Sequence, residues 1–253
     1  MSGVETPHRR VAVAIPCYNE AAAVALVVAE WRAALPDAEI VIFDNNSSDD
    51  TAAIARGLGV RVVPVPKQGK GYAVRAIFHE LKERDAVVMV DGDGTYPADC
   101  VGPLLEAVLS GAAEMSVGAR RPVDEPGAMT AVRGLGNRLI RLAFRVLIGP
   151  GAGDMLSGYR VFGPGFLRGV TLRSRGFEIE TELTAEAVLR GLRVFEVVVP
   201  YRPRIVGTTS KLRVFRDGRR ILARIVKESV RRRPWRPLVL LAALLAIAWL
   251  VLA

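Results

Sequence analysis

The stretch that decides the fold is Ala86-Val87-Val88-Met89-Val90-Asp91-Gly92-Asp93, which is followed by Gly94-Thr95-Tyr96-Pro97. The apolar run has the length of a buried strand, and turn-forming residues bound it. It therefore delivers Asp91 and Asp93 to the end of a strand, where open α/β sheets bind their ligands. Two carboxylates at such an edge can hold Mg²⁺ or Mn²⁺ while water and a diphosphate fill the remaining positions. Because a D-x-D pattern is common, its meaning depends on the motifs around it.

Strand-like and helix-like segments alternate along the rest of the chain. The first half predicts strands over 11–15, 39–43, 60–63, 86–90 and 114–117, with helices over 20–35, 49–57, 71–83 and 98–110 between them. A basic amphipathic stretch follows over 129–147, and then strands at 159–162 and 194–199 with a helix near 178–190 between them. This order predicts an α/β fold in which helices flank a mostly parallel sheet. The 253 residues, 51% of them hydrophobic, suffice to bury such a core.

Positive charge is concentrated near the C-terminus. Residues 202–236 hold thirteen Lys or Arg against two acids, so the rest of the chain is at −2 although the whole chain is at +9. Residues 237–253 carry no charge and reach the short limit for a membrane-spanning helix, with Trp235 and Trp249 near its ends. Each Lys or Arg near an anionic membrane surface contributes about 1 kcal/mol of attraction to its lipids. Because these cations lie beside an apolar segment, they indicate binding to anionic lipid rather than to nucleic acid or a merely solvated surface. We therefore expect one C-terminal span in the cell membrane and a cytoplasmic catalytic part.

Apolar residues recur at helical spacing among the cations of residues 211–233. The pattern is typical of an amphipathic helix at the membrane interface, and it equally suits a subunit contact in a homo-oligomer. The predicted partition is a catalytic domain over 1–210, a basic juxtamembrane helix over 211–236 and a transmembrane helix over 237–253, which can continue in a longer chain. The polar N-terminus predicts no secretory signal, and the two cysteines and two histidines show neither a disulfide framework nor zinc-ligand spacing.

Two further motifs end predicted strands. Pro16-Cys17-Tyr18-Asn19-Glu20 closes the first strand and opens the first helix. The second strand ends in Asp44, and turn-forming residues follow it. An acid at that tip can accept hydrogen bonds from a nucleobase or ribose, while Asp91 and Asp93 can bind a metal ion that holds phosphate. Since parallel strands end at the same edge, the three motifs converge on one crevice.

Six motifs in this order resemble the family 2 glycosyltransferases, especially the polyprenyl-phosphate branch that is like dolichyl-phosphate mannose synthase. They are PCYNE at 16–20, DNNSSDDT at 44–51, GKGYAVR at 69–75, DGDGTYP at 91–97, DMLSGYRVF at 154–162 and GTTSKL at 207–212. The resemblance covers residues 11–212. It implies a GT-A fold, a UDP- or GDP-sugar donor, Mg²⁺ or Mn²⁺ at the D-x-D, and an inverting transfer.

Roles for particular residues also follow from the resemblance. Lys70 is implied near the base or the diphosphate, and Asp91 and Asp93 are implied on the metal, with Gly92 between them. The S-G-Y-R element that begins at Ser157 and the G-x-x-S-K element that ends at Lys211 are implied to frame the site near the membrane. The residues implied to line the base and ribose pocket are Pro16, Tyr18, Glu20 and Asp44.

The chemistry of the acceptor separates two kinds of transfer. A sugar hydroxyl is a poor nucleophile and needs a carboxylate base, whereas a lipid phosphate is already an anion and needs cations that hold it in line. Asp154 and Glu180 are candidates for such a base or for orienting groups, and helical spacing places Glu178 and Glu182 on a different face from Glu180. Cations at motif-adjacent positions after the D-x-D are Arg120, Arg133, Arg160, Arg204 and Lys211.

The sequence therefore predicts an inverting, metal-dependent transferase that moves a sugar from a nucleotide diphosphate to polyprenyl phosphate, such as undecaprenyl or dolichyl phosphate. Two alternatives stay open. One is transfer to a carbohydrate hydroxyl in exopolysaccharide or glycolipid synthesis, and the other is non-catalytic binding of a sugar nucleotide at the membrane. Anionic lipids are expected partners and nucleic acid is not. A dinucleotide oxidoreductase is disfavoured because no G-x-G-x-x-G follows the first strand.

Overall fold

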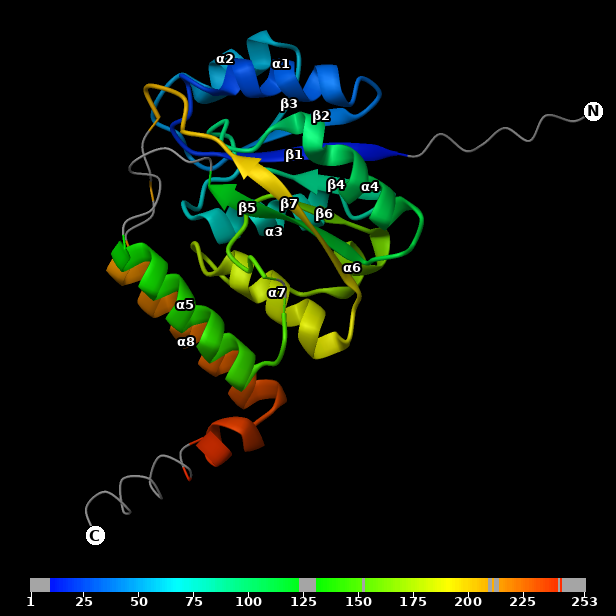
Figure 1. Ribbon diagram of the computed structural model, residues 1–253. Helices are drawn as coiled ribbons and strands as arrows, with labels where there is room; N and C mark the ends of the chain where they lie inside the picture. Colours follow the sequence, from blue (N-terminus) through cyan, green and yellow to red (C-terminus); the bar gives the residue numbers. More distant parts are fainter. Residues whose placement is uncertain are drawn as a thin grey trace, which may run out of the picture.

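The computed structural model describes residues 10–122, 131–151, 153–208, 211, 214–240 and 242. Its centre is a seven-stranded sheet with the strand order β3-β2-β1-β4-β6-β5-β7 (Figure 1). Hydrophobic runs of strand length form these elements, as the sequence predicts. The strands are β1 (Val11–Cys17), β2 (Glu39–Asp44), β3 (Arg61–Pro64), β4 (Ala86–Met89), β5 (Met115–Pro122), β6 (Arg160–Phe162) and β7 (Val194–Tyr201).

Six of these strands point the same way, because β1, β2, β3 and β4 pair in parallel and β5 pairs in parallel with β7. β6 is antiparallel to both of its neighbours. The carboxyl ends of the parallel strands and the beginning of β6 therefore meet at one edge of the sheet. This is the edge where ligands bind in open α/β sheets.

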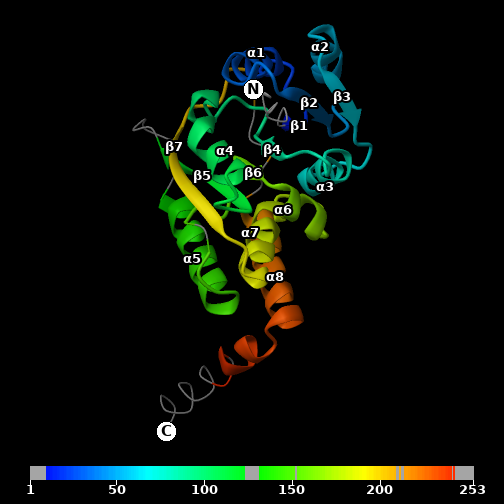
Figure 2. The ribbon, with the colours of Figure 1, turned by 90° about the vertical axis from the view of Figure 1, so that its right-hand side faces the viewer.

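Helices cover both faces of the sheet (Figures 1 and 2). Alternate residues of each strand point to opposite faces, so Ala12 and Ala14 pack with α3, α6 and α7 while Val13 and Ile15 pack with α1, α2 and α4. The helices are α1 (Val24–Ala34), α2 (Thr51–Gly57), α3 (Lys70–Glu80), the short η1 (Ala98–Cys100), α4 (Val101–Leu109), α5 (Ala131–Leu147), α6 (Pro164–Gly169), α7 (Ile179–Arg190) and α8 (Val214–Arg232).

The predicted strands and helices are present, with boundaries that differ by a few residues. The short helix α6 was not predicted, because its six residues are too few to show a helical period. Pro164 stands in its first turn, where a proline costs no hydrogen bond. The antiparallel direction of β6 was also not predicted, since a three-residue strand does not reveal its direction in sequence.

α5 and α8 lie side by side below the sheet and run in the same direction (Figures 1 and 2). The Ser229 hydroxyl of α8 donates to the Leu147 carbonyl of α5 at 2.9 Å, and Ile140, Phe144, Ile221 and Ile225 bury a small core between these helices and α7. α8 is thus the amphipathic helix that the sequence predicts near 211–233. Phe215, near the start of α8, is 87% exposed. Six further exposed apolar residues of the pair, hereafter the α5–α8 apolar face, are Leu139, Leu142, Val146, Leu222, Val226 and Val230.

Two predictions near the C-terminus lie largely or partly beyond the described residues. The span expected over 237–253 is described only at 237–240 and 242, and in the described part of the chain no helix is both long and apolar enough to cross a membrane. The motif at 207–212 is described only at 207, 208 and 211. Cys17 and Cys100 are free thiols, and the His79 side chain is 80% exposed.

Candidate active site

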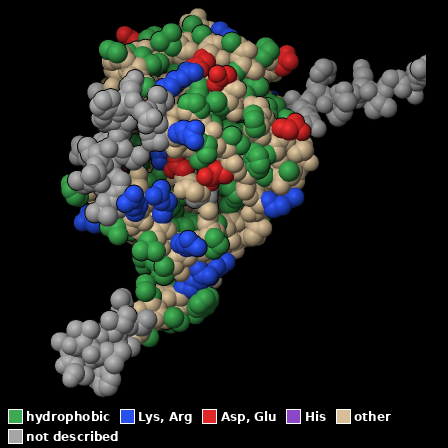
Figure 3. All heavy atoms as spheres, in the orientation of Figure 1, with side chains coloured by type: hydrophobic (Ala, Val, Ile, Leu, Met, Phe, Trp, Pro, Cys, Tyr) green, Lys and Arg blue, Asp and Glu red, His purple; other side chains and the backbone are tan. Residues whose placement is uncertain are grey.

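A cavity of about 1740 Å³ opens at the carboxyl edge of the sheet and reaches down to α5 and α8. Ligand pockets for one small molecule measure roughly 300–1,000 Å³, so this cavity has room for two substrates. Acidic and basic side chains lie close together on the face shown in Figure 3. The sequence-predicted residues that line the cavity are Pro16, Tyr18, Glu20, Lys70, Asp91, Gly92, Asp93, Arg120, Asp154, Glu180, Arg204 and Lys211.

The ammonium of Lys70 bridges two carboxylates at the centre of the cavity. Its Nζ lies 2.5 Å from Asp91 Oδ1, after β4, and 2.5 Å from Glu180 Oε1, on α7. Burial acts to lower the pKa of Lys70, but the two carboxylates outweigh it and hold that pKa above its ordinary value. Burial also raises the pKa of Glu180, and Lys70 works against that rise. Lys70 is therefore a fixed positive charge beside the first acid of the D-x-D.

The Asp91 carboxylate packs directly against the backbone of Gly158. A side-chain Cβ at Gly158 would lie 2.3 Å from Asp91 Oδ2, which no real contact permits. The glycine of the S-G-Y-R element thus makes room for the first acid of the D-x-D. This close approach explains why that motif and the D-x-D, far apart in sequence, belong to one site.

Asp93 is nearly buried and is held by three groups. Its Oδ1 accepts hydrogen bonds from the Thr95 backbone at 3.1 Å and the Thr95 hydroxyl at 2.7 Å, and its Oδ2 lies 2.5 Å from the Arg204 guanidinium. Arg204 follows β7, so it comes from the far side of the sheet edge. The turn at Thr95 fixes the second acid, and Arg204 balances its charge.

Glu20 and Lys211 lie together near the end of β1. Lys211 Nζ is 3.8 Å from Glu20 Oε1 and donates to the Asn19 carbonyl at 3.2 Å. Burial raises the pKa of Glu20 to about 7, although Lys211 opposes the rise. Lys211 therefore does reach the cavity, and it does so beside the predicted nucleotide end.

At the tip of β2, Asp44 stands opposite Cys17 in the strand register. One of its carboxylate oxygens is buried and has no hydrogen-bond partner within the described part of the chain. A buried acceptor without a partner is rare in folded proteins, and a ligand donor can satisfy it. The neighbouring Asn45 accepts from Gly69 N at 2.7 Å and donates to the carbonyls of Val65 and Lys67, so it fixes the loop that carries Lys70.

Arg120 and Asp154 form a two-pronged ion pair. Arg120 Nε donates to Asp154 Oδ2 at 2.6 Å and its terminal nitrogen donates to Oδ1 at 2.8 Å, while the Arg120 backbone donates to the same carboxylate at 3.1 Å. Burial acts to raise the pKa of Asp154, but the Arg120 hydrogen bonds and charge hold it below its ordinary value. The pair thus fixes the position of the Arg120 side chain and favours the charged form of Asp154.

The structure places Arg160 and Ser157 behind the cavity wall, where neither lines the cavity. Arg160 is fully buried and donates to the carbonyls of Ser157 and Met155 and to the Thr184 hydroxyl. Ser157 donates to the Gly118 carbonyl at 2.6 Å. The expectation that Arg160 faces a phosphate is therefore corrected: its guanidinium shapes the loop before β6. Arg133 belongs to α5, but its side chain lies outside the described residues.

A divalent cation fits the donor set at the sheet edge. Asp91 and Asp93 present hard carboxylate oxygens to the cavity, as Mg²⁺ and Mn²⁺ prefer. The described residues hold no cluster of three or more His, Cys, Asp or Glu side chains that would bind a metal alone. The remaining ligands would then have to come from water and a diphosphate, which is how Mg²⁺ usually binds beside phosphates.

Sequence reasoning missed several residues that line the cavity. Arg220, Arg224 and Lys227 reach it from α8. Their signal in the sequence was the amphipathic pattern of 211–233, which indicates a helix but not that one of its sides faces the site. Tyr201, at the end of β7, was also missed, and its ring lies 5.5 Å from the Arg120 guanidinium.

A mostly parallel α/β sheet with paired acids at its carboxyl edge defines a GT-A-like fold. The family model described as "Glycosyl transferase family 2" matches residues 12–160, from the first strand to the start of β6. The chain therefore belongs to glycosyl transferase family 2.

Two relatives from Haloferax volcanii match over most of the chain. Glycosyltransferase AglJ is 35% identical over 224 residues, which are 88% of this chain and 73% of that protein. A dolichyl-phosphate hexose transferase is 31% identical over 223 residues, which are 88% of this chain and 95% of that protein. The family resemblance seen in the motifs is thus confirmed.

The fold also matches solved structures. Glucosyl-3-phosphoglycerate synthase from Mycobacterium tuberculosis, in complex with Mn²⁺, UDP-glucose and phosphoglyceric acid, superposes with a TM-score of 0.71. The match covers 88% of this chain and 80% of that one, at 22% sequence identity. At this identity the likeness shows a shared GT-A-like fold.

Proposed function

We propose that this protein transfers a sugar from a nucleotide-diphosphate donor to a polyprenyl phosphate at the cytoplasmic face of a membrane. The observation that carries the proposal is the pairing of charges in the cavity. Both carboxylates considered as a general base are bound by cations, Asp154 by Arg120 and Glu180 by Lys70. A hydroxyl acceptor needs a free base, whereas a phosphate acceptor needs cations. The relative that transfers hexose to dolichyl phosphate supports the same acceptor class.

The donor is assigned to the end of the cavity formed by β1, β2 and β4. The buried free oxygen of Asp44 suits a ribose hydroxyl or a base N–H, and Pro16 and Tyr18 line the adjacent wall. Asp91 and Asp93 would hold Mg²⁺ or Mn²⁺, which when bound neutralises the charge of the departing nucleoside diphosphate. Lys70 and Arg204 lie beside these acids and are placed to share that charge.

The proposed reaction is a single displacement. An oxygen of the acceptor phosphate attacks the anomeric carbon, a new C–O bond forms, and the bond to the diphosphate breaks with its electron pair on the leaving nucleoside diphosphate. No proton transfer is required, because the attacking oxygen is already an anion. Arg120, oriented by Asp154, is the cation that we assign to the acceptor phosphate, since it can hold two phosphate oxygens at once.

Membrane attachment is assigned to α5 and α8. The α5–α8 apolar face is exposed, and exposed arginines and a lysine flank it, which suits an anionic bilayer surface. The cavity reaches both helices, so a lipid phosphate at the bilayer surface would lie close to its opening. We accordingly retain the partition into a catalytic domain over 1–210, a juxtamembrane helix over 211–236 and a membrane span over 237–253.

A radiolabel transfer assay tests the function. Membranes that contain the full chain are incubated with UDP- or GDP-sugars, undecaprenyl or dolichyl phosphate, and Mg²⁺ or Mn²⁺. The expected result is an organic-phase product that mild acid cleaves, absent with Asp93→Asn. Label found only in a carbohydrate acceptor would overturn the lipid assignment in favour of a hydroxyl acceptor. Binding of the donor without any product would leave only a sugar-nucleotide binding protein.

A further inference from the structure

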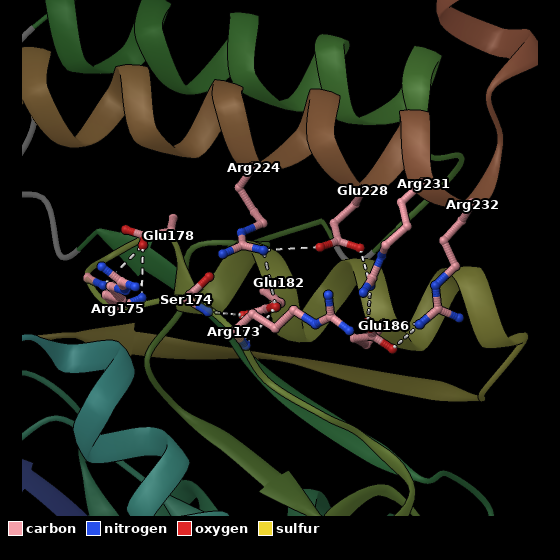
Figure 4. A network of polar contacts seen from close by, with 11 residues as sticks. Arg173, Ser174, Arg175, Glu178, Glu182, Glu186, Arg224, Glu228, Arg231 and Arg232 are labelled. Carbon is pink, nitrogen blue, oxygen red and sulfur yellow. Dashed lines mark hydrogen bonds and ion pairs between the residues drawn. The ribbon is translucent and has the colours of Figure 1, made fainter.

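We propose that Glu182 is a positioning residue for Lys70, and that Arg224 makes this positioning depend on α8. The inference rests on the proposed function in one respect, since it assigns Lys70 to the donor site. Neither Glu182 nor Arg224 was among the sequence-predicted site residues. Both belong to the charged network between α7 and α8 that Figure 4 shows.

The Glu182 carboxylate fastens a loop that lies across the cavity wall. It is fully buried and accepts hydrogen bonds from Arg173 N at 3.0 Å and Ser174 N at 2.7 Å. Glu178, one turn earlier on the same face of α7, accepts from Arg175 N and Gly176 N at 3.0 and 3.1 Å. Two carboxylates thus tie down four consecutive backbone amides, and the conformation of residues 173–176 depends on them.

This loop presses against the backbone that carries Lys70. A Cβ at Gly69 would lie 2.2 Å from the Arg175 carbonyl oxygen, and one at Gly71 would lie 2.4 Å from the Ser174 carbonyl oxygen. Both glycines are needed because the two segments touch through their backbones. Gly69 also has a φ of +137°, a conformation that other residues rarely adopt. Any shift of residues 174–175 would therefore shift Lys70, whose ammonium must stay within reach of both Asp91 and Glu180.

Arg224 connects this arrangement to α8. Its guanidinium lies 3.4 Å from Glu182 and 3.1 Å from Glu228, and only 10% of its side chain is exposed. The contact path thus runs from α8 through Arg224 and Glu182 to the 173–176 loop, and from there to Lys70. Because α8 carries half of the α5–α8 apolar face, the seating of this helix becomes part of the geometry around the D-x-D.

The same interface provides matched controls. Glu186, one turn beyond Glu182 on α7, is also buried and pairs with Arg231 and Arg232 of α8 at 3.0 Å each. Within the described part of the chain, its carboxylate accepts hydrogen bonds from arginine side chains and from no backbone amide of the loop. Arg232→Met and Glu186→Gln therefore disturb the same pair of helices but leave the Arg224–Glu182 ion pair and the hydrogen bonds of Glu182 to the loop in place, because Arg231 and Glu228 stand between Glu186 and Arg224.

Hydrogen–deuterium exchange of the full chain in detergent tests the path without any substrate. We expect the amides of 173–176 to exchange about tenfold faster in Glu182→Gln and Arg224→Met, as loss of one charge-assisted hydrogen bond predicts. Glu186→Gln and Arg232→Met should stay within about twofold of the wild type there, and Arg224→Lys should restore most of the protection. Wild-type exchange in Arg224→Met, or equal acceleration in the controls, would overturn the proposal.

A kinetic readout separates positioning from general loosening. Glu182→Gln should raise the KM for the nucleotide sugar about tenfold and leave the KM for the lipid phosphate within about twofold, because Lys70 serves the donor end. An equal rise in both constants would contradict the assignment to Lys70. If the wild type transfers no sugar at all, the proposed function fails, but the exchange experiment still decides the path from Arg224 to the loop.

Discussion

The Asp93 carboxylate lies 2.5 Å from the Arg204 guanidinium, across the edge of the sheet where β4 and β7 end. The other acid of the D-x-D has a similar neighbour, since Asp91 pairs with Lys70. Both acids are therefore held in place by cations before any ligand binds. In the proposed function, Asp91 and Asp93 would hold the divalent cation, and Lys70 and Arg204 would then be available to the phosphate oxygens of the donor.

Removal of the second acid should abolish transfer. Asp93→Asn keeps the shape and the hydrogen bond to Thr95 but lacks the charge that holds a divalent cation and Arg204. We expect kcat to fall by a factor of about 100 or more in the radiolabel assay, as for other losses of transition-state charge stabilisation. Asp99→Asn, at an exposed acid six residues later, is the control and should retain activity. Full activity of Asp93→Asn, or full activity of the wild type after the metal has been chelated, would contradict this role of Asp93.

Loss of the Lys70 ammonium should destabilise the fold in a pH-dependent way. Lys70→Met leaves Glu180 buried without a cation, which costs about 3 kcal/mol when the carboxylate is charged. Burial raises the pKa of Glu180, and without Lys70 nothing in the pair opposes that rise. A group whose pKa is higher in the folded than in the unfolded state stabilises the fold at low pH, and this contribution is lost as the pH rises. The loss of unfolding free energy in Lys70→Met should therefore be smaller at low pH and larger at high pH.

Urea unfolding of the detergent-solubilised protein at several pH values measures this effect. Lys82→Met, at an exposed position beyond α3, is the matched control and should change the free energy of unfolding by less than about 0.5 kcal/mol. A deficit for Lys70→Met that does not depend on pH would show that Glu180 is not the uncompensated group.

Sequence patterns predicted the sheet and the edge at which its acidic residues gather, and they did so for a physical reason. Apolar runs of strand length, alternating with helical periods, force a mostly parallel sheet, and in such a sheet Asp44, Asp91 and Asp93 must end at one edge. The partners of these acids could not be predicted in this way. Arg204 and Glu180 meet them only through the strand order, which depends on contacts between segments far apart in sequence.

Arg160 shows a different limit of sequence reasoning. The motif that contains Arg160 was identified, but the direction in which its side chain points was not. In β6 it shares a face with Phe162, which packs into the core under α3, α6 and α7, so its side chain points behind the cavity. Predicting this required the register of a three-residue strand. Arg224 was missed because an amphipathic pattern predicts a helix without naming what its charged side contacts, and for Glu182 helical spacing gave only the face that it shares with Glu178.

Glu20 should make stability depend on pH near neutrality. Its pKa is raised to about 7 by burial, above its ordinary value of 4.5, so the folded protein binds a proton that the unfolded chain releases. This contribution is complete below about pH 4.5 and is lost as pH rises through about 7. We expect it to reach about 3 kcal/mol, and Glu20→Gln should remove it.

The check is the free energy of unfolding of wild type and Glu20→Gln between pH 5 and 8. As the pH rises, the wild type should lose unfolding free energy relative to Glu20→Gln. Asp37→Asn, on an exposed loop before β2, serves as the comparison and should follow the wild type. Parallel curves for wild type and Glu20→Gln would show that Glu20 does not titrate in this window.

The α5–α8 apolar face should bind anionic bilayers. Val226→Asp places a charge in the middle of this face, at a side chain that is 46% exposed. Because burial of one aliphatic side chain contributes roughly 1.5–3 kcal/mol, we expect binding to vesicles of phosphatidylglycerol and phosphatidylcholine to weaken by about tenfold or more. Co-sedimentation measures it. Leu26→Asp changes an apolar residue on α1 that is 60% exposed and lies on the other side of the sheet, and it should not affect binding.

Asp154→Asn distinguishes an orienting residue from a general base, and with it the acceptor class. If Asp154 only orients Arg120, the amide keeps one of the two hydrogen-bond acceptors, and kcat/KM for the lipid phosphate should fall about tenfold while the shape of its pH profile stays unchanged. A general base would instead account for a factor of about 100 to 10,000 in kcat, and its loss would remove the acidic limb of the pH profile. Arg120→Lys changes the other member of the pair, because lysine keeps the charge but cannot donate to two phosphate oxygens in a bidentate geometry. A similar rise in the acceptor KM for Asp154→Asn and Arg120→Lys is therefore the expected signature of a phosphate held by an oriented arginine. A loss confined to kcat of Asp154→Asn would point to a hydroxyl acceptor.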